Sequence, residues 1–364
     1  MAINKSEVMI KWAINILWLG LLMHSSVFAN LNRNTIGKKN AIIITVAQNG
    51  TAQFKQIQLA INSIELSGNQ NVVIKIAPGI YDEKIYLKKS HISFLGAGID
   101  KTIITQSIAR DIWRCDQTDD WGVATFNVDS CSDISFSGLT IRNDYGFINT
   151  KDQVIACKSD STGVKTIKAT GHQMAFRSFN ATKLKFEQCR FVAFGGDTMS
   201  PWNTTNGMFY FKDCILEGGV DFYCPRGWAY AENCTFITHT GPAAIWHDGS
   251  FNEDSKTVLV NCSFKGYDGF NLGRYHRDAQ FYLINCHFPA NMSEEDIYLV
   301  PTTNAIQWGR RVYYFNCDKE KSPTGFYKNN LETAKGKPFG NEINANWVFK
   351  NNWNPLAESK KSKR

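Results

Sequence analysis

A short phrase built around cysteine recurs through the second half of the chain. The cysteines of neighbouring copies lie 20 to 31 residues apart, and in most copies a Phe or Leu two positions later shares a strand face with the cysteine. The copies are FEQCRF, FKDCIL, AENCTF, LVNCSF, LINCHF and YYFNCD, at Cys189, Cys214, Cys234, Cys262, Cys286 and Cys317. One short strand per copy at this period predicts a solenoid, in which each coil packs on its neighbours.

Two kinds of solenoid compete for this repeat. A leucine-rich repeat needs a strict Leu/Asn frame and helix-forming residues in each unit, and the sequence shows neither. Variable loops, β-branched strands and Asn or Cys at matching positions favour an all-β fold, the parallel β-helix. Equivalent residues of successive coils then stack about 4.8 Å apart, so we expect the cysteines to form an interior ladder. Disulfide bonding among the ten cysteines is the alternative in an exported chain.

The first residues are typical of an export signal. Lys5 and Lys11 precede an apolar run, and Val27-Phe28-Ala29 forms a small-residue cleavage site. We therefore expect cleavage after Ala29 and a secreted or periplasmic protein that keeps no membrane anchor.

The remaining chain predicts one large domain. We expect a leader over 30–40, the β-helix over 41–318, and a tail over 319–364 that packs on the coil and ends in a basic segment. Residues 53–64 predict a short helix with its apolar side chains on one side, which should cap the N-terminal end of the solenoid.

Charge and residue spacing exclude several function classes. Part of the formal charge of +7 lies in the two ends of the chain, and the body is only weakly basic. Such a body suits an acidic polymer substrate but lacks the dense basic stripe of a nucleic-acid binder. None of the His and Cys spacings suggests a zinc site. We expect no metal and no cofactor, and a monomer.

Three polar residues follow the period of the coil. Gln173, Asp197 and Asp221 are separated by 24 and again 24 residues, which predicts that they lie on successive rungs of one face. Two carboxylates so close cannot both ionise freely, so the pair can supply a nucleophile and a general acid. Arg274, about two coils further on, is a candidate partner for one of them. The alternative is that both aspartates only cap turns beside glycine.

At these residues the chain resembles the pectin methylesterases, carbohydrate esterases on a right-handed single-stranded parallel β-helix. The resemblance extends from about residue 43 to 316. Its motifs are VAQNGTAQFKQIQLAINSI, APGIYDEKI, LGAGIDKTII, GHQMAFR, GGDT, GGVDF and LGR.

The resemblance implies a role for each of the four residues. Asp221 would be the nucleophile that attacks the methyl ester of a galacturonate unit in pectin. Asp197 would protonate the leaving methanol and then activate water. Gln173 would help stabilise the oxyanion, and Arg274 would pair with Asp221.

The chain departs from the family pattern beside these motifs. Gly196 stands where the family usually has Gln, which removes one oxyanion donor, so we expect Gly196→Gln to leave activity unchanged or to improve it. Arg274 is followed by Tyr275 and His276 in place of Pro-Trp. The expected substrate contacts are Phe222, Tyr275, His276, Trp202 and Trp308, while Arg226 and Arg277 are weaker candidates for binding substrate carboxylates.

Other functions on the same scaffold stay open. The departures allow a β-helix that has lost activity and only binds polysaccharide, or an esterase for a different ester. The NTD, DD, GHG and RIK motifs of polygalacturonases are not found, and no carboxylate cluster suggests the calcium site of a pectate lyase.

Overall fold

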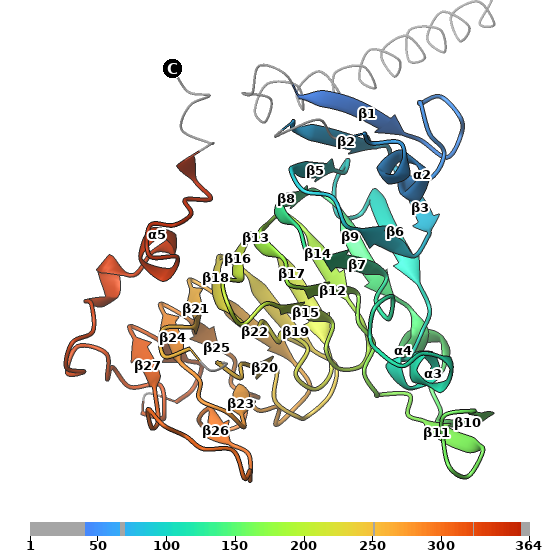
Figure 1. The fold of residues 1–364 in the computed structure, drawn as a ribbon. Helices are drawn as coiled ribbons and strands as arrows, with labels where there is room; N and C mark the ends of the chain where they lie inside the picture. The colour runs from blue at the N-terminus through green and yellow to red at the C-terminus, as the bar shows by residue number, and fades with distance from the viewer. Residues whose placement is uncertain (1–40, 66–69, 250–251, 323, 358–364) are drawn as a thin grey trace, which may run out of the picture. The chain divides into compact units, whose positions relative to one another are not determined.

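Short parallel strands wind into a solenoid in the computed structural model, which describes residues 41–65, 70–249, 252–322 and 324–357. Three sheets run along it, and Figure 1 shows their strands stacked from the blue end to the orange end. The ten-stranded sheet contains β1 (Ile42–Val46), β2 (Val72–Ile76), β5 (Ile92–Leu95), β8 (Ser132–Ser137), β13 (Thr182–Glu187), β16 (Met208–Lys212), β18 (Trp228–Glu232), β21 (Lys256–Val260), β24 (Phe281–Ile284) and β27 (Val312–Phe315).

The second sheet has nine strands, and each lies one tight turn after a strand of the first. It contains β3 (Gly79–Asp82), β6 (Thr102–Gln106), β9 (Thr140–Asn143), β14 (Arg190–Val192), β17 (Ile215–Gly218), β19 (Thr235–Thr238), β22 (Ser263–Gly266), β25 (His287–Phe288) and β28 (Asp318–Lys319).

The third face is built from two shorter runs of strands. They are β4 (Ile85–Leu87), β7 (Phe126–Asp129), β12 (Phe176–Phe179) and β15 (Met199–Trp202), then β20 (Ile245–Trp246), β23 (Gly273–Tyr275) and β26 (Tyr298–Leu299). Parallel bridges from Tyr223 to Met199 and to Ile245 join the two runs, so this face continues from coil to coil.

The core is a set of side-chain ladders, because every strand buries alternate residues. Phe94, Phe136, Phe186 and Phe211 stack face to face on successive coils, with ring centroids 4.9 to 5.1 Å apart. The six cysteines of the repeated phrase are free, and all but the partly buried Cys317 are buried. The predicted interior cysteine ladder is therefore confirmed.

The residue before each of these cysteines turns the corner of the coil. These six residues have φ between 50° and 54°, a left-handed conformation that Asn tolerates better than most residues. Neighbouring side chains are hydrogen-bonded along the stack, for example Asn285 Nδ2 to Asn261 Oδ1 at 3.0 Å and Asn316 Nδ2 to Asn285 Oδ1 at 2.9 Å. The Asn-Cys pairs thus fix both the corner and the core of the coil.

The predicted N-terminal helix exists but is shorter than expected. α2 (Ile57–Asn62) packs on β1 and β4 and buries Ile57, Ala60 and Ile61. The expected start at residue 53 was too early, because Phe54 already forms a bridge with Val46 of β1.

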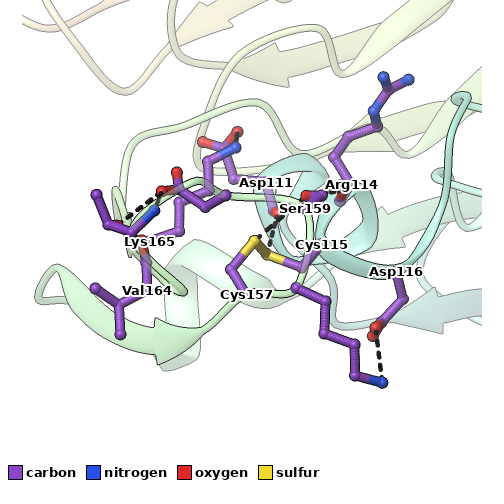
Figure 2. The surroundings of a disulfide bond; sticks show 11 residues. Asp111, Arg114, Cys115, Asp116, Cys157, Ser159, Val164 and Lys165 are labelled. Atoms are coloured by element: carbon purple, nitrogen blue, oxygen red, sulfur yellow. Dashed lines mark hydrogen bonds and ion pairs between the residues drawn. A yellow bond between two sulfur atoms is a disulfide. The ribbon is translucent and has the colours of Figure 1, made fainter.

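Two further short helices and a hairpin leave the coil on one side, which the repeat did not predict. They are α3 (Arg110–Asp116), α4 (Tyr145–Ile148) and the antiparallel pair β10 (Gln153–Ala156) and β11 (Val164–Ile167). A disulfide between Cys115 and Cys157 joins α3 to the end of β10, as Figure 2 shows. This bond is an exception to the prediction that the cysteines form a ladder.

In the described part of the segment after β28, residues 320–322 and 324–357, the helices are η1 (Gly340–Glu342) and α5 (Ala345–Val348). Trp347 of α5 packs against Tyr282, with ring centroids 5.2 Å apart. The proposed domain limits remain predictions, and the predicted signal segment lies outside the described residues. None of the described helices is long and apolar enough to cross a membrane.

Candidate active site

The coil register brings Asp197 and Asp221 to neighbouring rungs. Parallel bridges pair His172 with Gly196 and Met199 with Tyr223, so equivalent positions here are separated by 24 residues, as the sequence predicted. Both aspartates have left-handed backbone, with φ of 57° and 52°. The same conformation recurs at the corners of the coil, so it does not by itself distinguish these two residues. Burial, with a smaller contribution from the charge of Asp197, raises the pKa of Asp221.

Arg274 reaches Asp221 from two coils further along. Arg274 Nε donates to Asp221 Oδ1 at 3.0 Å, and Nη2 donates to Oδ2 at 2.7 Å. Arg274 follows the buried Gly273 on β23, so its side chain points out of the coil. The paired geometry matches the two oxygens of a carboxylate and fixes its orientation.

The surroundings push the two carboxyl pKa values in opposite directions. Burial raises the pKa of Asp221, and the hydrogen bonds and charge of Arg274 only partly oppose it. Burial also acts to raise the pKa of Asp197, but the charges of His172, Arg226 and Arg177 outweigh it, so that pKa is lowered. Opposite shifts in a close pair separate an acid from a base, but here they place the shared proton on Asp221 and leave Asp197 ionised, the reverse of the roles that the resemblance implies.

Asp197 lies among groups that the repeat did not reveal. The thiol of Cys224 donates to its Oδ1 at 3.5 Å, and burial raises the pKa of that thiol, which keeps it protonated. Positive charge reaches Asp197 from the two neighbouring coils, from His172 and Arg177 on one side and from Arg226 on the other. Sequence reasoning gave these neighbours little or no weight, because His172 and Arg177 lie in the GHQMAFR motif but only its Gln173 was assigned a role.

Gln173 lies on the predicted rung, but its amide is bonded to the backbone below the site. Its Oε1 accepts from the N–H groups of Gly146 and Gly195, at 3.0 and 3.2 Å, and its Nε2 donates to the carbonyl of Ala169 at 2.6 Å. The side chain is fully buried. These bonds hold the GGDT loop against α4, so the geometry gives Gln173 a positioning role in place of the expected oxyanion donor.

Gly196 is required by close packing. A Cβ at this position would lie 2.5 Å from the Val220 carbonyl oxygen and 2.8 Å from Cδ2 of His172. The space that a Gln side chain would need at this point is taken by His172 and by the next coil. The expectation that Gly196→Gln is harmless therefore does not fit the structure.

The expected substrate contacts divide into buried and accessible residues. Phe222 and Tyr275 belong to the hydrophobic core, so neither ring is open to a sugar, which corrects the sequence prediction. Trp202 is 40% exposed. His276 is half-buried, bonded through Nδ1 to Asp248 at 2.9 Å, and Trp308 is also half-buried.

Aromatic and cationic side chains share the outward face of β20 and β23. The Arg274 guanidinium lies 5.4 Å from the centroid of Trp246, and the same ring packs on His276 at 4.8 Å. Aromatic faces beside positive charge suit a polymer of acidic sugars. Within the described residues, no group of three or more His, Cys, Asp or Glu side chains could hold a metal ion.

Known proteins resemble this chain in sequence and in fold. The family model described as Pectinesterase matches residues 43–192. Probable pectinesterase 50 of Arabidopsis thaliana is 29% identical over 247 residues, which cover 64% of this chain and 58% of the relative. Probable pectinesterase 49 of the same plant is 30% identical over 241 residues, with the same two coverages of 64% and 58%. The chain thus spans less than two thirds of the length of these relatives.

Solved structures confirm the predicted parallel β-helix. The pectin methylesterase PemA from Erwinia chrysanthemi has a TM-score of 0.66 and 18% identity, over 88% of this chain and 99% of that one. A pectin methylesterase in complex with a hexasaccharide has a TM-score of 0.65 and 18% identity, over 86% and 98%.

Proposed function

We propose that the chain is a carboxylic ester hydrolase of the pectinesterase family that removes methyl esters from galacturonate units of pectin, which the family match over residues 43–192 and the similarity to pectinesterases support. The products are pectate and methanol. The observation that carries this proposal is the pairing of Asp197 and Asp221 on adjacent rungs, with Arg274 bonded to Asp221 through both carboxylate oxygens. Aspartates that only cap turns would need no arginine bonded to both carboxylate oxygens.

In the first half of the proposed reaction, an ionised Asp221 oxygen attacks the ester carbonyl. The tetrahedral intermediate collapses to an acyl-enzyme, and Asp197 gives its proton to the leaving methanol. Arg274 holds Asp221 in the attacking orientation. With Gln173 bonded to backbone and Gly196 in place of Gln, we assign no side-chain oxyanion donor from the family pattern.

In the second half, Asp197 takes a proton from water. The resulting hydroxide attacks the acyl carbon, and the bond to Asp221 breaks. Asp221 leaves in its ionised form, and the galacturonic acid that is freed loses its proton to solvent to become the carboxylate. One proton thus passes through Asp197 in each direction, as general acid–base catalysis requires. We also include export by the predicted signal segment, a monomeric state and a pectin or polygalacturonate partner in the proposal.

The test is methanol release by purified protein from highly methylated pectin, with Asp221→Asn and Asp197→Asn as matched variants. We expect release by the native protein and a loss of at least about a thousandfold in each variant. Absence of methanol at every pH, with polysaccharide binding retained, would instead support the non-catalytic binder. Release of acetate but not methanol would support an esterase for a different ester.

A further inference from the structure

One buried thiol outside the cysteine ladder contacts a carboxylate of the proposed site. The ladder thiols donate to backbone carbonyls, as Cys189 does at 3.3 Å. Cys224 is also fully buried, but its Sγ donates to Oδ1 of Asp197 at 3.5 Å. It comes three residues after Asp221, and the Tyr223 ring before it lies in the core. Because neighbouring residues of an extended chain point to opposite sides, Cys224 faces the rung of Asp197.

This thiol provides the hydrogen bond that the Asp197 carboxylate receives. Among the residues that the structure describes, no other group donates a hydrogen bond to this side chain, and His172, Arg177 and Arg226 act on it through their charge. Asp197 is partly open to solvent. The thiol therefore holds Oδ1 and leaves Oδ2 as the oxygen that can face a ligand.

The thiol proton has a second acceptor within reach, so it can follow the protonation state of Asp197. Sγ also lies 3.5 Å from the Met199 carbonyl oxygen, which already accepts from the Cys224 N–H at 3.0 Å. Burial raises the pKa of the thiol, so the group keeps its proton and acts as a donor. An ionised carboxylate is the stronger acceptor. We therefore expect the thiol to bind ionised Asp197 and to turn to Met199 when Asp197 carries a proton.

We propose that Cys224 is a positioning residue for Asp197, whose thiol holds Oδ1 while Oδ2 exchanges the proton with methanol and water. This inference rests on the proposed function. The thiol itself neither gains nor loses a proton. When Asp197 gives its proton to methanol, the hydrogen bond strengthens because its acceptor becomes an anion, which favours proton release. The charged groups that face the pair are His172, Arg177, Arg226 and Asp221.

Matched variants separate this role from a merely structural one. Cys224→Ala should lower kcat about two- to tenfold, the rate change that corresponds to an ordinary hydrogen bond, and leave KM near the native value. Loss of the donor destabilises ionised Asp197, so the acidic limb of the profile of kcat against pH should move to higher pH. Cys224→Ser should restore part of both properties, since a hydroxyl is also a donor. Cys189→Ala is the control, because it removes a fully buried thiol that donates to backbone, and it should keep the native kcat and profile.

The S–H stretching band in the infrared spectrum tests the contact without turnover. The difference between native protein and Cys224→Ala isolates the Cys224 band, which should move to lower frequency as pH rises and Asp197 ionises. Asp197→Asn should abolish this movement, and its difference from native protein shows the effect even if Cys224→Ala does not fold. A band that stays fixed across pH, or equal losses of kcat in Cys224→Ala and Cys189→Ala, would overturn the proposal. Absence of methanol release by native protein would reject the esterase function, whereas the infrared titration would still report the bond to Asp197.

Discussion

Arg274 and Asp221 form a two-point ion pair across two coils, through Nε to Oδ1 at 3.0 Å and Nη2 to Oδ2 at 2.7 Å. Asp221 is nearly buried, whereas Arg274 is partly open to solvent. The pair opposes the rise in the Asp221 pKa that burial causes, and it fixes the orientation of the carboxylate through both oxygens. Orientation and ionisation of the proposed nucleophile thus depend on one side chain.

Replacing Arg274 should therefore lower turnover more than substrate affinity. We expect Arg274→Gln to reduce kcat about ten- to a hundredfold, the rate change that corresponds to the free energy of a hydrogen bond to a charged group. Arg274→Lys should recover only part of the lost kcat, because lysine cannot form the paired geometry. Steady-state methanol release measures both constants. Lys212→Gln, which breaks the 3.0 Å pair with Glu232 on the first sheet, is the control and should keep native kcat.

The two carboxyl shifts predict a bell-shaped pH profile in the acidic range. The reaction needs one proton on the pair, and a singly protonated pair exists between the lowered pKa of Asp197 and the raised pKa of Asp221. In that range the proton lies mainly on Asp221, so the proposed reaction starts from the less populated form, in which Asp197 carries the proton. Activity should fall as pH falls through the lower value, since both groups are then protonated. It should fall again as pH rises through the higher value, since both are then ionised.

His172 offers a direct test of the acidic limb. Its charge is the largest effect that lowers the pKa of Asp197, so His172→Gln should move that limb to higher pH. The profile of kcat/KM against pH measures the shift. His287→Gln is the matched control, because His287 is bonded to Asp318 on the second sheet, and both limbs should stay in place. If the acidic limb of the profile stays in place in His172→Gln, charges other than that of His172 determine the pKa of Asp197.

Gly196 should tolerate no side chain. Its missing Cβ faces the Val220 carbonyl oxygen at 2.5 Å, and backbone cannot move away as a flexible side chain can. We expect Gly196→Ala to lower the free energy of unfolding by about 1–3 kcal/mol and to reduce kcat, with Gly196→Gln at least as damaging. Gly241→Ala is the control, since a Cβ there meets nothing nearer than 4.0 Å. Native activity in Gly196→Gln would contradict the packing argument.

The sequence predicted those parts of the fold and site that repeat with the coil. Asp197 and Asp221 were paired from a spacing of 24 residues, because one turn of the solenoid sets that spacing. The cysteine ladder followed from the same logic. The start of the N-terminal helix was misjudged because Phe54 is held by a bridge to β1, which local apolar spacing does not reveal.

Contacts that leave the repeat could not be predicted. Gln173 is bonded to Gly146 of α4, an insertion whose position no periodicity fixes. Phe222 lies beside Asp221 in sequence, but it follows a turn outside the strands and its ring is fully buried in the core. Arg177, Trp202 and Arg226 come from three successive coils, and the sequence does not show that the two guanidinium groups pack over the Trp202 ring.

The disulfide between Cys115 and Cys157 should stabilise the insertion and, through it, the site. It closes a separation of 42 residues, which predicts a loss of about 2–4 kcal/mol in the free energy of unfolding for the Cys115→Ser, Cys157→Ser double variant. α3 begins at Arg110, whose N–H donates to the His172 carbonyl at 2.9 Å, so KM should also rise. Urea unfolding and methanol release measure the two effects. Reductant should destabilise the native protein by a similar amount and leave the double variant unchanged, whereas an equal effect on both would place the stabilisation elsewhere.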